Sequence, residues 1–185
     1  NPNGYNLSHL KNNTVKRAIS REEMARIRDY QPQTKSIHFA RDIFMFSYLS
    51  HGMNFRDIIQ LRWEDFNQGR FIYVRSKTAK KTHNPTPLSV KVSPAHQEII
   101  ERWGVRQSRY VFGMLDDEKQ PTRLERERHI NSKRSSFILK LRELGEKIGL
   151  ETRLTSYVAR HSWASNQNFA NTNPALIGQA MGHKD

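Results

Sequence analysis

Apolar residues recur with a helical period over most of the chain. The segment 37–49 is apolar around almost its whole circumference, which is typical of a helix buried at the centre of a helical domain. Before it, Ser20 and Glu23 have the spacing of a capping box and predict the start of a helix that stops before Pro32. After it, the apolar residues over 55–61 predict a second short helix. The first third of the chain is therefore expected to be helical.

A period of two replaces this pattern only in the middle of the chain. After a turn at 67–69, the segments 70–75 and 86–92 alternate as strands do and predict a small antiparallel sheet. A basic loop over 76–85 is expected to join the two strands.

The helical pattern then returns. Helices are expected from Ser93-Pro94 onward, over 137–148, over 155–169 and from Asn173-Pro174 onward. The charged and poorly periodic segment 115–128 is expected to be a mobile part of the surface. The predicted fold class is mainly α with a small antiparallel β-sheet.

Composition narrows the class of protein. With 185 residues, 36% of them hydrophobic and 10% aromatic, one domain with a real core is expected. No stretch approaches the roughly 20 apolar residues of a membrane span. Cysteine is absent, which excludes disulfides, cysteine-ligated zinc and thiol catalysis, and is consistent with a reducing cytoplasm.

The charge balance points to a polyanionic partner. A net charge of +13 and a pI near 10.3 favour nucleic acid over an anionic membrane surface, although solubilising charge is the alternative. The cations gather in two clusters, Arg75, Lys77, Lys80 and Lys81 in the first and Arg123, Arg126, Arg128, Lys133 and Arg134 in the second. Such clusters suit contacts with a DNA backbone, and their alternative is a solvated surface.

Several kinds of chemistry have no sequence support. The histidines include no His-Glu-x-x-His spacing, so no metal site is predicted. A glycine-rich phosphate loop and a Gly-x-Ser-x-Gly elbow are absent as well. We therefore expect no cofactor.

The most specific signal is the run 155–164, which contains Tyr-Val-Ala-Arg-His-Ser-Trp, followed later by Met181-Gly182-His183. Two further motifs lie upstream, the run 52–57 and Ser76-Lys77-Thr78. They occur in the same order as the arginine helix and the lysine turn of the tyrosine recombinase (phage integrase) family. The sequence resembles this family over nearly its whole length. Its motifs are most similar to those of integrases from mobile elements of the Bacteroides group.

The resemblance implies a role for individual residues. Arg160 would hold the phosphate, Lys77 would be the general acid, His183 would hydrogen-bond a non-bridging oxygen, and Tyr157 would donate one bond where the family has histidine. Arg75, Lys80, Lys81 and Arg56 would contact DNA. The alternatives are a phosphate-contacting surface role for Lys77, a buried ion pair for Arg160, a helix C-terminal charge for His183 and a core position for Tyr157. His161 is assigned to packing or to a buried hydrogen bond.

Three positions depart from the family pattern. The first catalytic arginine maps onto Asn54, and Arg56 lies about 200° further round a helix of about 3.6 residues per turn, so Arg56 cannot simply substitute. Arg41, Arg56 and Arg62 are nearby candidates. Tyr157 stands in place of the family histidine, and the nucleophilic tyrosine is expected beyond Asp185.

These observations lead to one interpretation and two rivals. We expect a linker-like segment over 1–19 and a catalytic domain over 20–185 that is truncated before its nucleophile, so that the fragment itself is inactive. The full-length protein would cleave and rejoin double-stranded DNA in recombination or integration of a mobile element. It would self-associate on paired sites. It would act on DNA in the bacterial cytoplasm and have no membrane partner. The rivals are a non-catalytic DNA-binding paralogue, which the departures at Asn54 and Tyr157 favour, and a basic RNA-binding domain.

Overall fold

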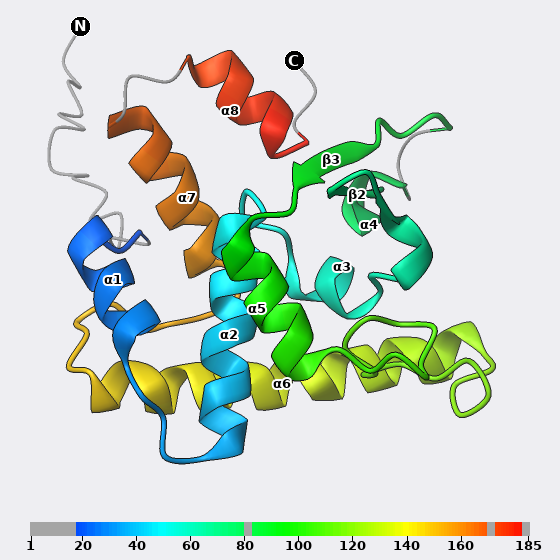
Figure 1. Cartoon of the computed structure of the whole chain (residues 1–185), viewed down its shortest axis with the longest axis horizontal. Coiled ribbons are helices and arrows are strands. Elements are labelled where there is room, and N and C mark those ends of the chain that lie inside the picture. Colours follow the sequence, from blue (N-terminus) through cyan, green and yellow to red (C-terminus); the bar gives the residue numbers. More distant parts are fainter. Residues whose placement is uncertain (1–17, 80–82, 170–172, 183–185) are drawn as a thin grey trace, which may run out of the picture.

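The structure is a computed structural model in which residues 18–79, 83–169 and 173–182 are described. The linker-like segment predicted over 1–19 lies outside these residues except for its last two positions. In the described part, helices surround one central helix, and a small sheet covers one end of it (Figure 1). The predicted mainly α class with a small antiparallel sheet is confirmed.

The central helix is α2 (Lys35–Leu49), which contains the apolar run that predicted it. Phe44 and Phe46 are completely buried, as expected for a helix that is apolar on all sides. Four helices pack against it: α1 (Arg21–Asp29), α5 (Pro94–Trp103), α6 (Arg123–Lys147) and α7 (Val158–Phe169). The capping box of Ser20 and Glu23 begins α1 as predicted.

The sheet has the order β1-β2-β3 and is antiparallel throughout. Its strands are β1 (Phe66–Asn67), β2 (Arg70–Tyr73) and β3 (Leu88–Lys91). Phe71 pairs with Val90 in the register, and both side chains are buried, so the alternation of the two predicted strands is confirmed. The short strand β1 was not predicted, because two residues are too few to show a period.

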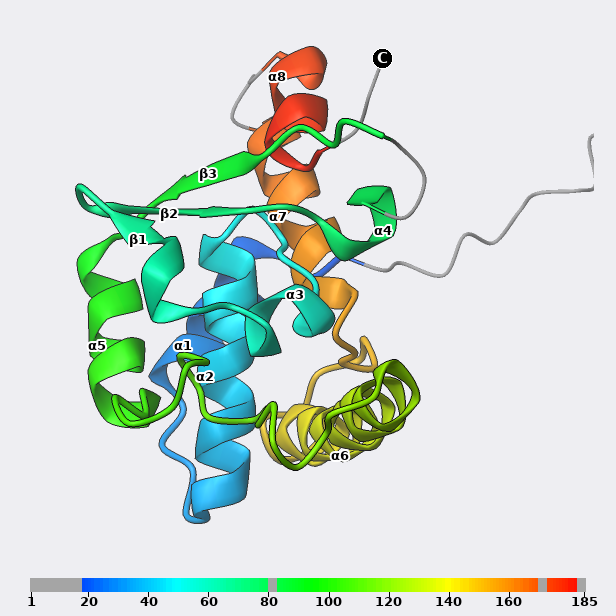
Figure 2. The same cartoon turned by 90° about the vertical axis from the view of Figure 1, so that its right-hand side faces the viewer.

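Short elements connect these parts. The helix α3 (Phe55–Ile59) follows α2 as predicted, and the 3-10 turn η2 (Trp63–Asp65) leads into β1. A helical turn, α4 (Ser76–Ala79), occupies the beginning of the segment that the sequence suggested was a loop. The last described helix, α8 (Pro174–Ala180), lies above β3 (Figure 2). Gly182 follows this helix, and a Cβ added to it would lie 3.0 Å from the side chain of Leu88 in β3.

The sequence predicts a mobile surface segment over 115–128, but the structure has the beginning of a long helix within it. The helix α6 begins at Arg123, where Thr122 and Glu125 form a capping box that the sequence contained and that the periodicity argument overlooked. Leu115 is buried, with 3% of its surface exposed.

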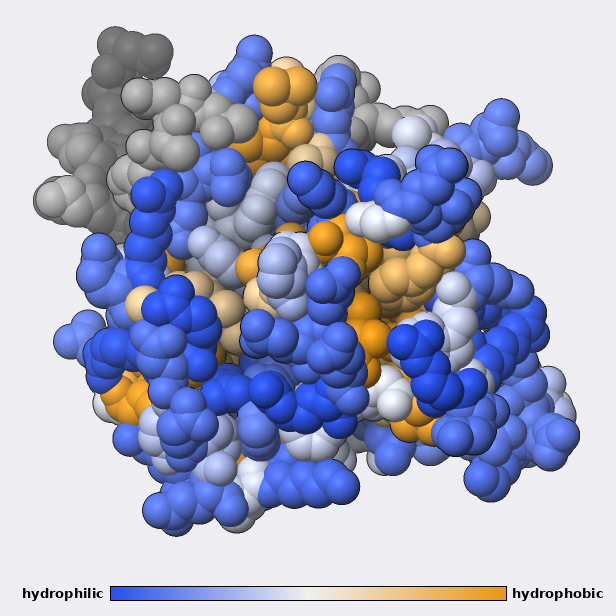
Figure 3. Space-filling model, in the orientation of Figure 1, coloured by the Kyte–Doolittle hydropathy of each residue, from blue (hydrophilic) through white to orange (hydrophobic). Residues whose placement is uncertain are grey.

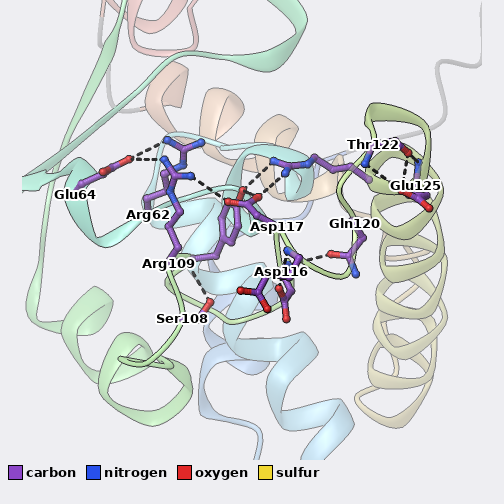
Figure 4. Close-up of polar contacts among 12 residues, drawn as sticks. Arg62, Glu64, Ser108, Arg109, Asp116, Asp117, Gln120, Thr122 and Glu125 are labelled. Carbon is purple, nitrogen blue, oxygen red and sulfur yellow. Dashed lines mark hydrogen bonds and ion pairs between the residues drawn. The ribbon is translucent and has the colours of Figure 1, made fainter.

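Before α6, the chain is held by the carboxylate of Asp117 (Figure 4). Asp117 accepts hydrogen bonds from the hydroxyl of Tyr110 (2.7 Å), from Arg109 (3.0 Å) and from Arg126. The Tyr110 bond, followed by those of the two arginines, lowers the pKa of Asp117 to about 2. The charged residues around Asp117 therefore bind one another and connect this exposed segment to Tyr110.

The face of the molecule in Figure 3 is mostly hydrophilic, with hydrophobic residues visible over α8 at its top and in a strip near its centre. Leu176 of α8 is 57% exposed. None of the helices in the described ranges has the length and apolarity that a membrane crossing requires.

Candidate active site

Arg160 lies in the first turn of α7 and is almost completely buried, with 4% of its surface exposed. Its guanidinium donates to two carbonyl oxygens, from Nη1 to Gly52 (3.3 Å) and from Nη2 to Met181 (2.6 Å). These bonds join the end of α2 and the end of α8 to one side chain. Both acceptors are neutral, so among the described residues Arg160 does not form the buried ion pair that was its alternative role.

Gly52 is required by the close approach of this arginine. Its φ is +73°, and a Cβ at this position would lie 2.4 Å from the Cα of Arg160. A side chain here would clash with backbone atoms that have no room to move, and the backbone conformation itself disfavours other residues. The glycine thus sets the position of Arg160.

A second guanidinium lies beside the first. Arg75, just after β2, is 7% exposed, and its Nη1 donates to the same carbonyl oxygen of Met181 at 3.3 Å. Its Nε is buried and has no hydrogen-bond partner. Within the described part of the chain, neither arginine forms an ion pair, and burial followed by the charge of Arg75 lowers the pKa of Arg160.

Lys77 lies on the helical turn α4, which is attached to α3 through Asp57. The carboxylate of Asp57 accepts hydrogen bonds from the backbone N–H of Ser76 (3.0 Å) and from its hydroxyl. Gln60 donates to the same hydroxyl at 3.1 Å. The beginning of the lysine turn is therefore held in place, although the sequence suggested a flexible loop.

Burial raises the pKa of Asp57, and hydrogen bonds from Ser76, the charge of Arg75 and a hydrogen bond from the side chain of Asn54 oppose this effect. Asp57 was not predicted as a site residue, although it stands at the acidic position of the motif over 52–57. That position was the signal that could have identified it. Asn54, which stands where the family has arginine, is thus a neighbour of Asp57.

A cavity of about 460 Å³ opens at this place. It is lined by Asn54, Phe55, Arg56, Asp57, Ser76, Lys77, Arg134, Ser156 and Tyr157. Three of these side chains are cations, and they come from α3, α4 and α6. Arg56 forms a bidentate ion pair with Glu127, with 2.7 Å from Nη1 to Oε1, so one of these cations has a carboxylate partner.

Tyr157 joins the cavity to the buried arginines. It lines the cavity, lies one helical turn before Arg160, and is close enough to act on the pKa of that residue. Its side chain is 47% exposed, so the alternative that Tyr157 is a core residue is wrong. His161 packs edge-on against its ring, with the centroids 4.6 Å apart, in agreement with the packing role predicted for it.

The other predicted site residues fall into two groups. His183, Lys80 and Lys81 lie outside the described residues. The candidates to replace the arginine expected at Asn54 all have carboxylate partners: Arg41 pairs with Asp42, Arg56 with Glu127 and Arg62 with Glu64. Arg75, predicted only as a DNA contact on the hairpin loop, is instead buried next to Arg160.

The described residues of this region do not form a metal site. Over the described ranges, no three histidine, aspartate or glutamate side chains come together as metal ligands would. The arrangement presents guanidinium and ammonium groups next to a cavity, which suits a phosphate bound by hydrogen bonds and charge.

Solved structures with the same fold are DNA recombinases. The chain aligns over 91% of its length with the XerA recombinase (TM-score 0.58, 15% identity, 56% of that chain) and with the XerH site-specific recombinase bound to its difH substrate (0.59, 14%, 47%). It aligns to the same extent with the catalytic core of lambda integrase (0.54, 12%, 93% of that chain). The chain therefore spans about half the length of the XerA and XerH chains. Among curated proteins, no sequence matches it.

The sequence itself gives a family match. Residues 17–185 match the phage integrase family, which covers the cavity, both buried arginines and the lysine turn. The structural likeness to recombinases agrees with this assignment at the level of the fold. The chain belongs to the phage integrase family.

Proposed function

We propose that the protein carrying this chain is a tyrosine recombinase that cleaves and rejoins double-stranded DNA in site-specific recombination or integration of a mobile element. The observation that carries the proposal is a pair of buried guanidiniums, those of Arg75 and Arg160, that have no carboxylate partner among the described residues. Arg75 directly precedes Ser76 and Arg160 lies three residues after Tyr157, and both Ser76 and Tyr157 line the cavity together with Lys77. Family membership supports the reaction class.

In the proposed reaction, a tyrosine hydroxyl attacks the scissile phosphorus. A bond forms between the tyrosine oxygen and phosphorus, the bond from phosphorus to the 5′ oxygen breaks, and a 3′-phosphotyrosine and a free 5′ hydroxyl result. The nucleophile is expected beyond Asp185, so the chain from Asn1 to Asp185 alone is predicted to bind DNA without cleaving it. Rejoining is the reverse reaction with a 5′ hydroxyl of a second strand.

Arg160 is the group proposed to bind the non-bridging oxygens. Negative charge grows on these oxygens as the pentavalent transition state forms, and a preorganised guanidinium stabilises that charge without having to reorganise. Its two carbonyl acceptors fix its orientation before DNA arrives. His183, outside the described residues, is proposed to donate a further hydrogen bond to the phosphate.

Lys77 is proposed as the general acid. The departing 5′ oxygen needs a proton, and the ammonium of Lys77 would give it one as the bond to phosphorus breaks. The Asp57–Ser76 hydrogen bonds hold the beginning of the turn that carries Lys77. Tyr157, on the wall of the same cavity, is proposed to donate a hydrogen bond to the phosphate.

DNA is the proposed partner, and two duplexes must come together for strands to be exchanged. The net charge of +13 supports binding to the DNA backbone. Arg56, Arg75, Lys80 and Lys81 are proposed to lie at this interface. We also propose that the protein self-associates on paired sites, needs no metal or organic cofactor, and acts in the bacterial cytoplasm.

Covalent trapping tests the proposal. The full-length protein, continued past Asp185, is incubated with a library of randomised duplexes that carry nicks, so that the released 5′ strand diffuses away and the adduct accumulates. Adducts that survive denaturation are isolated, and their DNA is sequenced to give the target. We expect an adduct linked through a 3′-phosphotyrosine, at least about 100-fold reduced in Arg160→Gln, and unchanged in the matched control Arg70→Gln on β2.

The rival functions predict different results. A DNA-binding paralogue would bind duplex DNA and form no adduct with any member of the library. An RNA-binding domain would prefer RNA to duplex DNA, and Arg160→Gln would weaken its binding by no more than one phosphate contact. Either result contradicts the proposed reaction.

A further inference from the structure

The site described above has one guanidinium where its chemistry calls for two. A phosphate in transition has two non-bridging oxygens on which charge grows, and one arginine cannot fully neutralise both of them. In this chain, Asn54 stands where the resemblance places the second arginine, and an amide carries no charge. The positive charge must therefore come from another element.

Ion pairs distinguish the candidates. Arg41 donates to Asp42 from Nε (2.8 Å) and Nη2 (2.7 Å), and both side chains are buried. Arg56 is held bidentately by Glu127, and Arg62 is paired with Glu64 at 2.8 Å. Moving any of these guanidiniums to a phosphate would break an existing ion pair, which costs free energy.

Arg75 meets the requirements that these three do not. Among the described residues, its side chain forms one hydrogen bond, the long one to the Met181 carbonyl oxygen, and its Nε is buried without an acceptor. That same oxygen accepts from Arg160, so the two guanidiniums converge on one point. A buried N–H without an acceptor is costly, and a phosphate oxygen would satisfy it with a charge-assisted bond.

We propose that Arg75 is the second catalytic arginine of this protein, binding a non-bridging oxygen of the scissile phosphate from the end of β2. The inference rests on the proposed function and gives a role to a residue that the sequence assigned only to DNA contact. The phosphate takes the place of the Met181 carbonyl as acceptor, and Nε gains the partner that it lacks. Arg75 then acts on the same phosphate as Lys77, which lies two residues further along the chain.

The position of Asn54 agrees with this exchange. Its side chain is a hydrogen-bonding neighbour of Asp57, whose carboxylate holds the first residue of the lysine turn. An arginine at this place would put a further positive charge in a region where burial and the charge of Arg75 already lower the pKa of Arg160. The neutral amide therefore fits a site that receives its second cation from β2.

The test compares cleavage of two substrates under single-turnover conditions. One is the duplex identified by trapping, and the other carries a methylphosphonate at the scissile position, where a neutral methyl group replaces one charged oxygen. For Arg75→Gln we expect the rate on the ordinary duplex to fall about 100- to 1,000-fold. On the methylphosphonate we expect a fall of no more than about tenfold, because less charge has to be neutralised.

Two further variants make the result specific. Arg75→Lys keeps the charge without the planar fork, so its rate should lie between those of the wild type and Arg75→Gln. Arg70→Gln removes an exposed guanidinium from the same strand, and should leave both rates unchanged. Thermal unfolding of each variant shows whether the fold is intact.

Each other outcome overturns the inference. Arg75→Gln within about threefold of the wild type on the ordinary duplex means that Arg75 takes no part in the reaction. Equal losses on both substrates mean that its role is structural. A wild-type protein that forms no adduct overturns the proposed function as well, whereas an active wild type beside an active Arg75→Gln overturns this inference alone.

Discussion

Two regions of this molecule bury arginine side chains, and they treat the charge in opposite ways. In α2 and α5, the carboxylate of Asp42 accepts from Arg41, from Arg102 at 2.6 Å and from the indole of Trp103 at 2.7 Å. In the candidate active site, Arg75 and Arg160 share a carbonyl oxygen and have no ion pair among the described residues. The first region is electrically compensated, and the second is not.

The two regions differ in how their buried charge is stabilised. Burial would raise the pKa of Asp42, but hydrogen bonds from Trp103, Arg102 and Arg41 outweigh it and the pKa is lowered, so the pairs stabilise the charged form. Arg75 and Arg160 have no such compensation, and a guanidinium cannot escape its charge by losing a proton at ordinary pH. A pair of this kind is stabilised by an anion, and the anion that we propose is a DNA phosphate.

Breaking the compensated region should have the largest effect on stability. Asp42→Asn keeps the shape of the side chain but leaves Arg41 buried without a counter-charge, and we expect a loss of about 3–5 kcal/mol in the free energy of unfolding. Denaturant unfolding measures it. The control is Asp29→Asn, which removes an exposed pair with Arg28 and should unfold like the wild type. Equal stability of the two variants would contradict the comparison.

A smaller but still large effect is expected when the backbone that places Arg160 is changed. Gly52→Ala combines backbone strain with a clash against Arg160 and should cost about 2–4 kcal/mol. Gly69→Ala has a similar φ of +70° with no atom within 4 Å of the added methyl group, so it should cost about 1 kcal/mol. Thermal unfolding of both variants separates the clash from the strain. If their costs are equal, the close approach to Arg160 does not matter.

A third buried group allows the comparison to be extended to pH. His96 is 1% exposed, and burial followed by the charge of His51 lowers its pKa to about 4. The unfolded chain, with a histidine pKa of about 6.5, binds the proton first, so stability is complete above about pH 6.5 and falls by about 2–3 kcal/mol as the pH drops towards 4.

Unfolding measured from pH 7 to pH 4 tests this behaviour against a matched variant. In His96→Gln, which keeps a hydrogen-bonding side chain next to Ser50 and Ser93, the part of the slope that belongs to His96 should disappear. The same slope in both proteins would mean that other groups cause it.

The smallest effect on stability is expected where charge is not compensated. Arg75→Gln removes a buried charge and one long hydrogen bond, so the free energy of unfolding should change by less than about 1 kcal/mol. The affinity of this variant for nonspecific duplex DNA should also fall, and the slope of log affinity against log salt concentration should decrease by about one unit. Fluorescence anisotropy across a salt series measures both quantities. A loss of stability as large as that of Asp42→Asn would remove the distinction between the two regions.

Much of the fold follows from local patterns. The capping box at Ser20, the Ser93-Pro94 helix start and the apolar run of α2 placed helices where the structure has them. The alternation over 70–75 and 86–92 placed β2 and β3. These features depend on residues close together in the sequence, which is why periodicity and capping detect them.

Other features were missed or wrong because their causes lie at a distance in the chain. The strand β1 exists because Phe66 pairs with Phe71, and two residues have no period of their own. The segment 115–128 is ordered because Tyr110, Arg109 and Arg126 converge on Asp117. Charge density alone suggested a solvated surface, since the sequence does not show which charges meet.

The candidate site shows the same division. The sequence alone determined the family resemblance, the excess of cations and the choice of Arg160 and Lys77 as candidate site residues, because these depend on residue types in a fixed order. Only the tertiary structure decided which arginines are free to act on a phosphate. Arg41, Arg56 and Arg62 are paired, whereas Arg75 lies against the Met181 carbonyl, 106 residues away in the sequence. Burial and pairing arise when distant segments pack together, so no motif records them.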